Sequence, residues 1–479
     1  MSTPTEQVSK EKGEASTDEK KNVYHDWIPN VTKLVEWLYS FCNEHTPPTM
    51  EQRDFDMKYQ IGMCIKVLET IPEENRQSQY ERSTYEYLKG RVYDAQPNVY
   101  KKEAEYHLVK ATQLDPSMLD AWNCLGMCVA KTGDYYRAKN CYDFVLRVDE
   151  SSAILRQLAE LELATARASE GSAKHLEECI KYSQRSLALD HKNGRSLYTL
   201  GSAYFTSFLL TGGWNHDTLL LSLEAYEKAE KLYVMNSHPT LRYDIGIVNR
   251  LLENYKRSLI GLENAASKNP YIDALDQVKL TLQLLDKLEG ILQCKSNDKN
   301  NDKSKGKSKG KSKGKSKGKS TGKSRGTSLS SLIQSLATID LNPSYNRATM
   351  DLLTEGLNKG VAVIGAVRCF VKYEYNAPLY YVLCDSDENS FVLTVFGIQK
   401  EAIKQGDQVT LLEPYCKFVD FEWEGKLTPP YNTSGQGALE PLATHYQFKS
   451  VRVNLLEQVL VNGNALSPNF AIRESIQLK

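Results

Sequence analysis

Apolar positions change their spacing once along this chain. From Val31 to Leu292 they recur every three or four residues, which places side chains on one face of an α-helix. From Gly360 onward the chain instead carries short runs rich in Val, Leu and aromatic residues, which are typical of β-strands. The 479 residues therefore predict a multidomain protein with an all-α part followed by a small all-β part.

One set of spacings recurs through the helical part. Its clearest copy comprises Trp122, Leu125, Gly126, Gly133, Tyr135, Ala138 and Tyr142. This is the tetratricopeptide pattern, in which two helices cross where small residues let the backbones approach. The same spacing fits 90–116, 200–229 and 245–270, and a degenerate copy is expected between Ser151 and Asp190. Four matches predict a tetratricopeptide-repeat superhelix, with a non-repeating helical bundle as the alternative.

The predicted boundaries follow the changes of pattern. We expect a polar tail over 1–21, the helical-repeat domain over 22–293, a linker over 294–328, a connecting segment over 329–357, the barrel over 358–465 and a tail over 466–479. Amphipathic helices are expected at Val31–Phe41 and Glu51–Leu68, before the repeats. A last helix at Ile272–Leu292 is expected to cap the repeats, since the end of a solenoid must shield its apolar face.

The all-β part is expected to be an OB-fold barrel. Its five predicted strands are Val361–Tyr373, Leu379–Cys384, Phe391–Phe396, Gln408–Leu412 and Tyr446–Val453. A short helix is expected at Ile398–Lys404, after the third strand, as in OB folds. Such barrels often bind single-stranded nucleic acid through aromatic side chains, here Tyr373, Tyr375, Tyr380 and Tyr381. However, residues 359–479 carry 11 Lys/Arg against 13 Asp/Glu, which favours a structural or protein-binding barrel.

The linker between the two parts is strongly basic. It repeats Lys-Ser-Lys-Gly, and residues 294–328 hold 13 Lys/Arg against 2 Asp/Glu. Because Gly and Ser are flexible and lysines repel one another, we expect an extended, disordered segment. It could neutralise nucleic-acid phosphates without base specificity, or it could be a solubilising spacer.

The repeats suggest a peptide-binding groove. Stacked helix pairs form a concave surface that usually binds extended peptides, and the first helix of each pair lines it. The candidate groove residues on those helices are Asn123, Lys131, Tyr198, Ser202, Tyr243 and Arg250.

No motif in the sequence calls for catalysis. The eight histidines form no His-Glu-x-x-His pair, and neither Cys-x-x-Cys nor Gly-x-Ser-x-Gly occurs. We therefore expect no enzyme activity, no metal and no cofactor. The first 21 residues lack a signal-peptide pattern and no apolar run reaches 18 residues, so neither secretion nor a membrane span is expected.

Several short sequences are shared with one family. They are Gly194–Gly201 followed by a Thr-Gly insertion, Ala121–Gly126, Leu383–Asp387, and Tyr446–Val453 with Val461-Asn462-Gly463. With the order of helix pairs and barrel, they make roughly residues 80–465 resemble the tetratricopeptide repeat protein five family. The resemblance implies a cytosolic role, in which the repeats recognise the first residues of nascent tubulins at the ribosome and trigger decay of the tubulin message. It also implies a nuclear role as a stress-responsive transcriptional cofactor.

The resemblance implies further site residues. A basic stretch after the repeats contacts the ribosome in this family, and the matching residues here are Lys319, Lys323 and Arg325. Where the family has an Arg after Leu-Ser-Met, this chain reads Leu158–Leu163, with Arg156 and Arg167 on either side. Where the family has an acid after Asn-Pro, this chain has Thr240.

Asp244 lies one helical turn after Thr240 and could replace that acid in reading an Arg of the peptide. The changed positions leave two explanations open: a different peptide ligand, or a shifted alignment through the degenerate repeat. Three functions stay open accordingly: a ribosome-associated reader of nascent tubulin, a general scaffold or transcriptional cofactor, and a nucleic-acid binder. We expect the first in the cytoplasm and the second in the nucleus.

Overall fold

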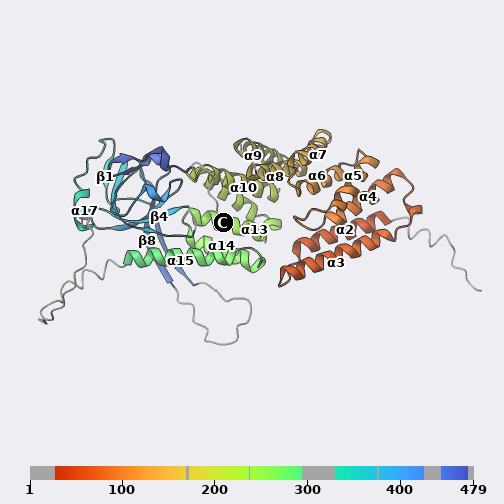
Figure 1. Ribbon diagram of the computed structural model, residues 1–479, viewed down its shortest axis with the longest axis horizontal. Helices are drawn as coiled ribbons and strands as arrows, with labels where there is room; N and C mark the ends of the chain where they lie inside the picture. The colour runs from red at the N-terminus through yellow and green to blue at the C-terminus, as the bar shows by residue number, and fades with distance from the viewer. Residues whose placement is uncertain are drawn as a thin grey trace, which may run out of the picture. The chain divides into compact units, whose positions relative to one another are not determined.

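A computed structural model describes residues 27–168, 172–236, 238–293, 329–374, 377–424 and 444–472. The described residues exclude the expected tail over 1–21, the basic linker over 294–328 and the end of the chain after 472. Lys319, Lys323 and Arg325 belong to that linker. The chain divides into two compact units (Figure 1). The first comprises Met1–Ala168 and Lys181–His191, and the second comprises Ser169–Ile180 and Lys192–Lys479.

The first unit is helical. Its helices are α2 (Trp27–Glu44), α3 (Met50–Glu69), α4 (Gln79–Asp94), α5 (Lys102–Leu114), α6 (Leu119–Ala130), α7 (Tyr135–Val148) and α8 (Ser152–Ala168), and α9 (Ser172–Leu189) is shared with the second unit. Side chains cap several of them: Thr49 begins α3, and Ser78 with Glu81 forms a capping box on α4. The small residue at the α6–α7 crossing is required, because a Cβ on Gly126 would lie 2.5 Å from the Tyr142 ring.

The second unit continues the helix pairs and adds the strands. Its helices are α10 (Gly194–Leu210), α11 (His216–Glu230), α12 (Tyr233–Asn236), α13 (Pro239–Leu251), α14 (Tyr255–Lys268), α15 (Ala274–Gln293) and α17 (Leu329–Leu336). As at Gly126, a Cβ on Gly201 would lie 2.6 Å from the ring of Tyr226 on the paired helix. The structure confirms the predicted order, in which helical repeats are followed by a small β domain.

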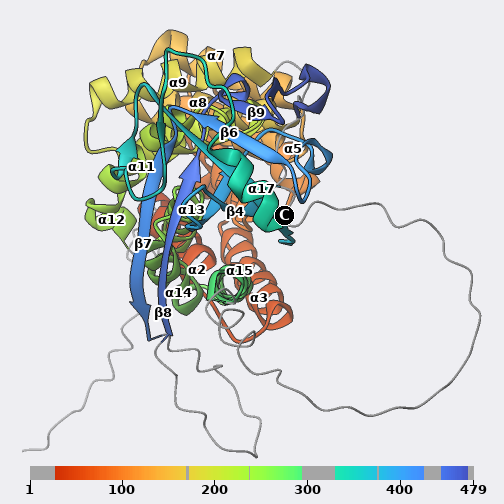
Figure 2. The same ribbon diagram turned by 90° about the vertical axis from the view of Figure 1, so that its left-hand side faces the viewer.

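The strands form one curved sheet. They are β1 (Asn346–Ala348), β2 (Gly356–Leu357), β3 (Val361–Val371), β4 (Leu379–Cys384), β5 (Ser390–Val395), β6 (Gln408–Leu412), β7 (Tyr415–Trp423), β8 (Thr444–Arg452), β9 (Val459–Val461) and β10 (Asn464–Ala465). The strand order is β10-β9-β6-β3-β4-β5-β8-β7-β2, and β1 pairs with β3. The β5–β8 pair is parallel, as is β1–β3. Figure 2 shows β7 and β8 side by side as a long antiparallel pair.

The β domain is larger than the five expected strands. β7 is not among those expected, and residues 329–357, expected only to connect the two parts, contribute α17, β1 and β2. Met350 and Leu353 of that segment are buried in the same core as Val363, Leu393 and Val451 of the barrel strands. The helix expected at Ile398–Lys404 is a single 3-10 turn, η2 (Lys400–Ala402).

Candidate functional site

Two candidate groove residues of the first unit are held by internal contacts. The Nζ atom of Lys131 donates to Asp94 O at 2.8 Å, to Asp94 Oδ1 at 2.9 Å and to Gln96 O at 3.2 Å. These bonds satisfy carbonyls at the C-terminal end of α4, so Lys131 joins α6 to α4. Arg156 donates from Nη1 to Glu160 Oε1 at 2.7 Å, one turn along α8. Its charge is therefore already paired within the helix.

The other two candidates in this unit differ in exposure. Asn123 is half-buried on α6, and its Oδ1 atom has no hydrogen-bond partner among the described residues. Arg167 is exposed near the end of α8. Close to the position where the family has an Arg, Leu163 is buried and Glu162 forms an ion pair with Lys139. This part of α8 therefore offers no exposed cation at the family position.

The second unit brings two candidate residues together. Tyr198 on α10 donates its hydroxyl to Asp244 Oδ2 on α13 at 2.8 Å. Both side chains are half-buried, and the Tyr198 ring lies 5.7 Å from Tyr226 and 6.1 Å from His238. Thr240, in the first turn of α13, is exposed one turn before Asp244. The structure thus places an oriented carboxylate next to the position where the family pattern has its acid.

His238 adds no charge of its own to this cluster at neutral pH. Burial, with Arg195 nearby, lowers the pKa of His238 below its ordinary value. The ring therefore stays neutral at pH 7. Its Nδ1 atom is buried without a hydrogen-bond partner in the described part of the chain.

Two further candidates are buried in the helix packing. The Ser202 hydroxyl lies 3.0 Å from the Tyr226 hydroxyl, and Arg250 donates from Nη1 to Gln277 Oε1 at 2.6 Å. Both residues are only 3% exposed, so they tie helices together and do not present a surface to a peptide. Tyr243 is half-buried on α13. The expectation that all six positions face the groove is corrected for Ser202 and Arg250: a polar side chain on the first helix can instead satisfy a neighbouring polar group.

The second unit also contains a polar joint between its helices and its barrel. Glu253 follows α13 in the left-handed conformation, with φ 59°, and is buried. It accepts hydrogen bonds from Thr394 Oγ1 at 2.7 Å and from Ser450 Oγ at 2.6 Å, on β5 and β8. Lys417 of β7 donates to Leu252 O at 2.9 Å and to Asn254 Oδ1. The sequence does not predict this joint, because each residue alone resembles an ordinary surface residue.

Burial changes the pKa of two basic side chains in the joint. It lowers the pKa of Lys417 and of Arg452, and the carboxylate of Glu253 partly offsets that effect on each. A buried carboxylate thus lies near the buried Arg452, the half-buried Lys417 and two hydroxyl donors. Such a cluster is stable only while each charge keeps its partners.

Aromatic packing extends the same joint. Phe396, which follows β5, lies 5.5 Å from Phe208 of α10 and 5.2 Å from His216 of α11 in edge-to-face arrangements. Tyr446 of β8 donates its hydroxyl to Asp286 of α15 at 2.7 Å, where α15 crosses β8 (Figure 1). The helices therefore cover the outer face of β4, β5 and β8.

This coverage corrects the expectation for the barrel aromatics. In OB folds the second and third strands, here β4 and β5, carry the face that binds single strands. Every residue of β4 is buried: Tyr381 packs in the barrel core, and Tyr380 lies on the covered face, 5.7 Å from Tyr373. Tyr375 lies outside the described residues. The described aromatic face is closed by the chain's own helices.

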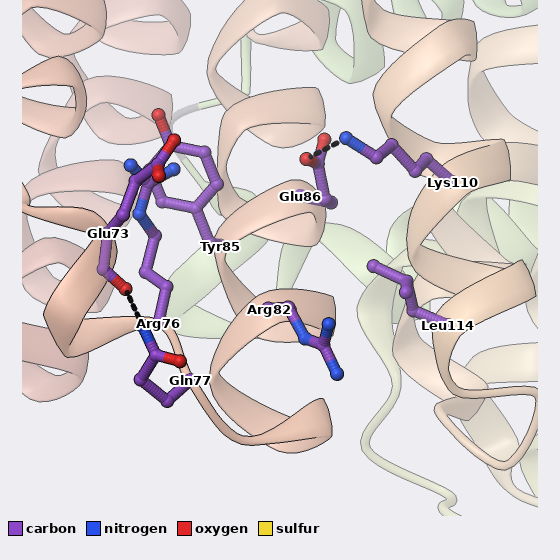
Figure 3. A pocket seen from close by; sticks show the side chains of 8 residues that line it. All are labelled: Glu73, Arg76, Gln77, Arg82, Tyr85, Glu86, Lys110 and Leu114. Atoms are coloured by element: carbon purple, nitrogen blue, oxygen red, sulfur yellow. Dashed lines mark hydrogen bonds and ion pairs between the residues drawn. The ribbon is translucent and has the colours of Figure 1, made fainter.

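The first unit has an ionic pocket of about 430 Å³ (Figure 3). It is lined by Glu73, Arg76, Gln77, Arg82, Tyr85, Glu86, Lys110 and Leu114. The Arg76 guanidinium lies 4.2 Å above the centre of the Tyr85 ring, and Lys110 pairs with Glu86 at 2.7 Å. Burial opposes the charged form of Glu86, but hydrogen bonds from His107 and Lys110 outweigh it and lower the pKa of that carboxyl. The lining supplies fixed charges and no nucleophile–base pair.

The described ranges contain neither a metal centre nor a membrane span. Within them, no group of three or more His, Cys, Asp or Glu side chains is placed to hold a metal ion. No helix in the same ranges is both long enough and apolar enough to cross a membrane.

Comparisons with known proteins agree with this architecture. Residues 344–475 match the family model described as the tetratricopeptide repeat protein 5 OB fold domain. The chain is 27% identical to tetratricopeptide repeat protein 5 of Mus musculus over 469 residues, which cover 93% of this chain and 95% of the relative. It is 26% identical to the Homo sapiens protein of the same name over 459 residues, covering 91% and 93%.

Solved structures give partial likenesses. A tetratricopeptide-repeat protein from Thermus thermophilus aligns with a TM-score of 0.34 and 15% identity, covering 43% of this chain and all of that one. YrrB, described as a repeat protein with an unusual peptide-binding site, aligns with a TM-score of 0.30 and 18% identity, covering 43% and 94%. The family model and the relatives confirm the resemblance expected from the sequence: the chain is similar along nearly its whole length to tetratricopeptide repeat protein 5, and its C-terminal domain matches that family's OB-fold model.

Proposed function

We propose that the protein is a non-catalytic adaptor that binds the amino terminus of nascent tubulin at the ribosome and promotes decay of the tubulin message. The observation that carries the proposal is the Tyr198–Asp244 hydrogen bond of 2.8 Å. It holds a half-buried carboxylate in one orientation next to the family's acidic position. The full-length similarity to tetratricopeptide repeat protein 5 supports the same role.

The chemistry of recognition follows from that carboxylate. An Arg of the peptide can approach Asp244 with two N–H groups of its planar guanidinium, and charge-assisted bonds of this kind are stronger than neutral ones. Because Tyr198 already fixes the carboxylate, little side-chain entropy is lost on binding. The neutral state of His238 keeps a competing positive charge away from the site.

The basic linker would supply the second contact. Lys319, Lys323 and Arg325 belong to a segment with a large excess of positive charge. We assign it the ribosome contact through phosphate neutralisation, which weakens steeply as salt rises. On this proposal the adaptor acts on tubulin in the cytoplasm.

A binding measurement with purified protein tests the proposal. Fluorescence anisotropy of a labelled tubulin amino-terminal peptide should show saturable binding, and Asp244→Asn should weaken it about tenfold or more, as expected for loss of a charge-assisted contact. Replacing the peptide's Arg by Ala should have a similar effect. Glu224→Gln, which removes a carboxylate from an exposed pair with Lys228 on α11, is the matched control and should leave binding unchanged. Absence of any saturable binding by the unmodified chain would refute the proposal.

A second candidate function is a general scaffold or transcriptional cofactor for other protein partners. It is favoured by α8, where Leu163 is buried and Arg156 is paired with Glu160. A peptide that is read by the family's arginine would meet no arginine at the matching position of this helix. Nuclear location, absence of ribosome co-sedimentation and absence of tubulin-peptide binding would together favour this second function.

A further inference from the structure

Helix α3 presents a row of large apolar side chains to solvent. Phe55, Tyr59, Met63 and Val67 are 66%, 58%, 42% and 42% exposed. They are spaced four residues apart, so they form a ridge along one face of the helix about 18 Å long. Another face of α3 packs against α2 and α4 in the core of the first unit, where it buries Met57, Cys64 and Leu68. The helix is thus apolar on two sides, and only one of them is covered by the first unit.

A groove of about 420 Å³ adjoins this ridge. Its α3 side consists of Lys58, Ile61, Gly62, Ile65, Lys66 and Glu69, and its other wall comes from Tyr93, Gln96, Lys101 and Glu103. Gly62 lies between the ridge and the groove, since it is adjacent to Met63 and one helical turn after Tyr59. Ridge and groove therefore form one continuous surface.

Packing within the unit does not require a glycine at position 62. A Cβ placed on Gly62 would meet no atom within 4 Å, and its backbone is ordinary α-helix. A glycine inside a helix weakens that helix relative to alanine. The missing side chain leaves room for another molecule to approach the α3 backbone closely.

The charges around the groove point to an acidic partner. Lys58, Lys66 and Lys101 have no side-chain hydrogen bond or ion pair within the described part of the chain, whereas Glu69 is paired with Lys89 at 3.6 Å. The groove therefore offers more available cations than anions. Acidic side chains flanking an apolar stripe would complement this arrangement.

We propose that this α3 surface docks an amphipathic helix of a partner protein. Its apolar stripe would lie on the ridge formed by Phe55, Tyr59, Met63 and Val67, and its acidic flank would face the three lysines. A helix fits better than an extended strand, because the four-residue spacing of the ridge matches the rows by which helices pack, and because Gly62 permits close approach of two backbones. The site uses none of the residues of the Tyr198–Asp244 cluster, so it would recruit an effector while a peptide is read.

The test uses the full chain and three fluorescent helical peptides. The first is an amphipathic helix with a Leu/Phe stripe flanked by Glu, the second has Lys in place of Glu, and the third is a scrambled version of the first. We expect the Glu-flanked peptide to bind at least about tenfold more tightly than the others. Tyr59→Glu combined with Met63→Glu should weaken that binding by about tenfold or more, since central apolar anchors dominate such interfaces.

Gly62→Leu separates a docking role from a structural one. It should raise the thermal midpoint of the first unit, because leucine favours a helix, and should nevertheless weaken binding of the Glu-flanked peptide about tenfold. Tyr136→Glu, at a residue of α7 that is 78% exposed, is the control and should change neither. Equal binding of the three peptides, or undiminished binding by the double variant, would overturn the proposal. A concentration-dependent dimer in sedimentation velocity that the double variant abolishes would also overturn it, because a second copy would then be the occupant.

Discussion

Glu253 connects segments of the second unit that are far apart in the sequence. Its hydrogen-bond donors Thr394 and Ser450 lie 141 and 197 residues further along the chain. The left-handed backbone at this position ends α13 and directs the carboxylate to the barrel. A single turn residue therefore supplies the acceptor for two of the hydrogen bonds that join the barrel to the last helices.

Glu253→Gln tests this residue. The amide keeps an acceptor for both hydroxyls but removes the negative charge near the half-buried Lys417 and the buried Arg452, so we expect a loss of about 3 kcal/mol in the free energy of unfolding. Glu227→Gln, which breaks the more exposed ion pair with Arg257, should cost less than about 1 kcal/mol. Chemical denaturation followed by circular dichroism gives both values. Equal losses in the two variants would contradict the role of Glu253.

His216 makes the second unit sensitive to acid. Burial, with Arg452 nearby, lowers its pKa to about 3 from an ordinary 6.5. Between these values the unfolded chain binds a proton that the folded chain does not bind. Stability is therefore undiminished above pH 6.5 and falls as the pH drops below it, by up to about 1.4 kcal/mol per pH unit from this group.

His216→Phe should remove this acid dependence. Phenylalanine keeps an aromatic ring against Phe208 and Phe396 and cannot be protonated. We expect the stability difference between the variant and the unmodified chain to move in the variant's favour from pH 7 to pH 5, by about 2 kcal/mol. Urea unfolding at both values measures it. A difference independent of pH would contradict this account, because it would mean that His216 has the same pKa in the folded and the unfolded chain.

At the scale of helices, we predict opposite effects on stability when two glycines of the second unit are replaced by alanine. Gly201 on α10 lies against the Tyr226 ring, whereas a Cβ on Gly290 in α15 would meet nothing within 4 Å. Gly201→Ala should therefore destabilise the protein by about 1–3 kcal/mol through overpacking. Gly290→Ala should stabilise it by about 0.5–1 kcal/mol through helix propensity. Thermal denaturation of the two variants checks the signs, and a shared sign would be inconsistent with the helix crossing described for α10 and α11.

Helices and inner strands could be predicted from the sequence, because their apolar positions repeat. The degenerate repeat expected between Ser151 and Asp190 is observed as two helices, Ser152–Ala168 and Ser172–Leu189, and the strand expected at Leu379–Cys384 has those bounds. β7 escaped prediction because Lys417, Asp420 and Glu422 interrupt its apolar residues. Its pairing with β8 and its contact with the helices are tertiary effects, which local patterns do not encode.

The candidate site was predictable to a smaller degree. Tyr198 was expected from its place on the first helix of a repeat, and Asp244 from the family resemblance. The structure joins the two side chains through one hydrogen bond. Ser202 and Arg250 occupy the expected helices but turn toward Tyr226 and Gln277. Which face of a helix is covered depends on its neighbours, and a single sequence does not specify them.

At the scale of the molecule, the last helices and the barrel should unfold together. Tyr255 of α14 and Tyr380 of β4 are both fully buried where helices and barrel meet. Tyr255→Ala should therefore reduce amide-exchange protection in β4 and β8 as well as in α14, with a loss of about 3 kcal/mol. Tyr233→Ala, at an exposed position of α12, should leave all three segments unchanged. Lost protection in α14 alone would mean that the barrel is stable without the helices.

Selective recovery with ribosomes tests the central claim most directly. Ribosomes translating tubulin or an unrelated amino terminus are pelleted with the unmodified chain, with Asp244→Asn, and with a variant lacking residues 303–325. The proposed adaptor predicts recovery of the unmodified chain on tubulin ribosomes only, weakened by Asp244→Asn and lost without the basic segment. Equal recovery on both kinds of ribosome, or recovery on neither, would contradict it.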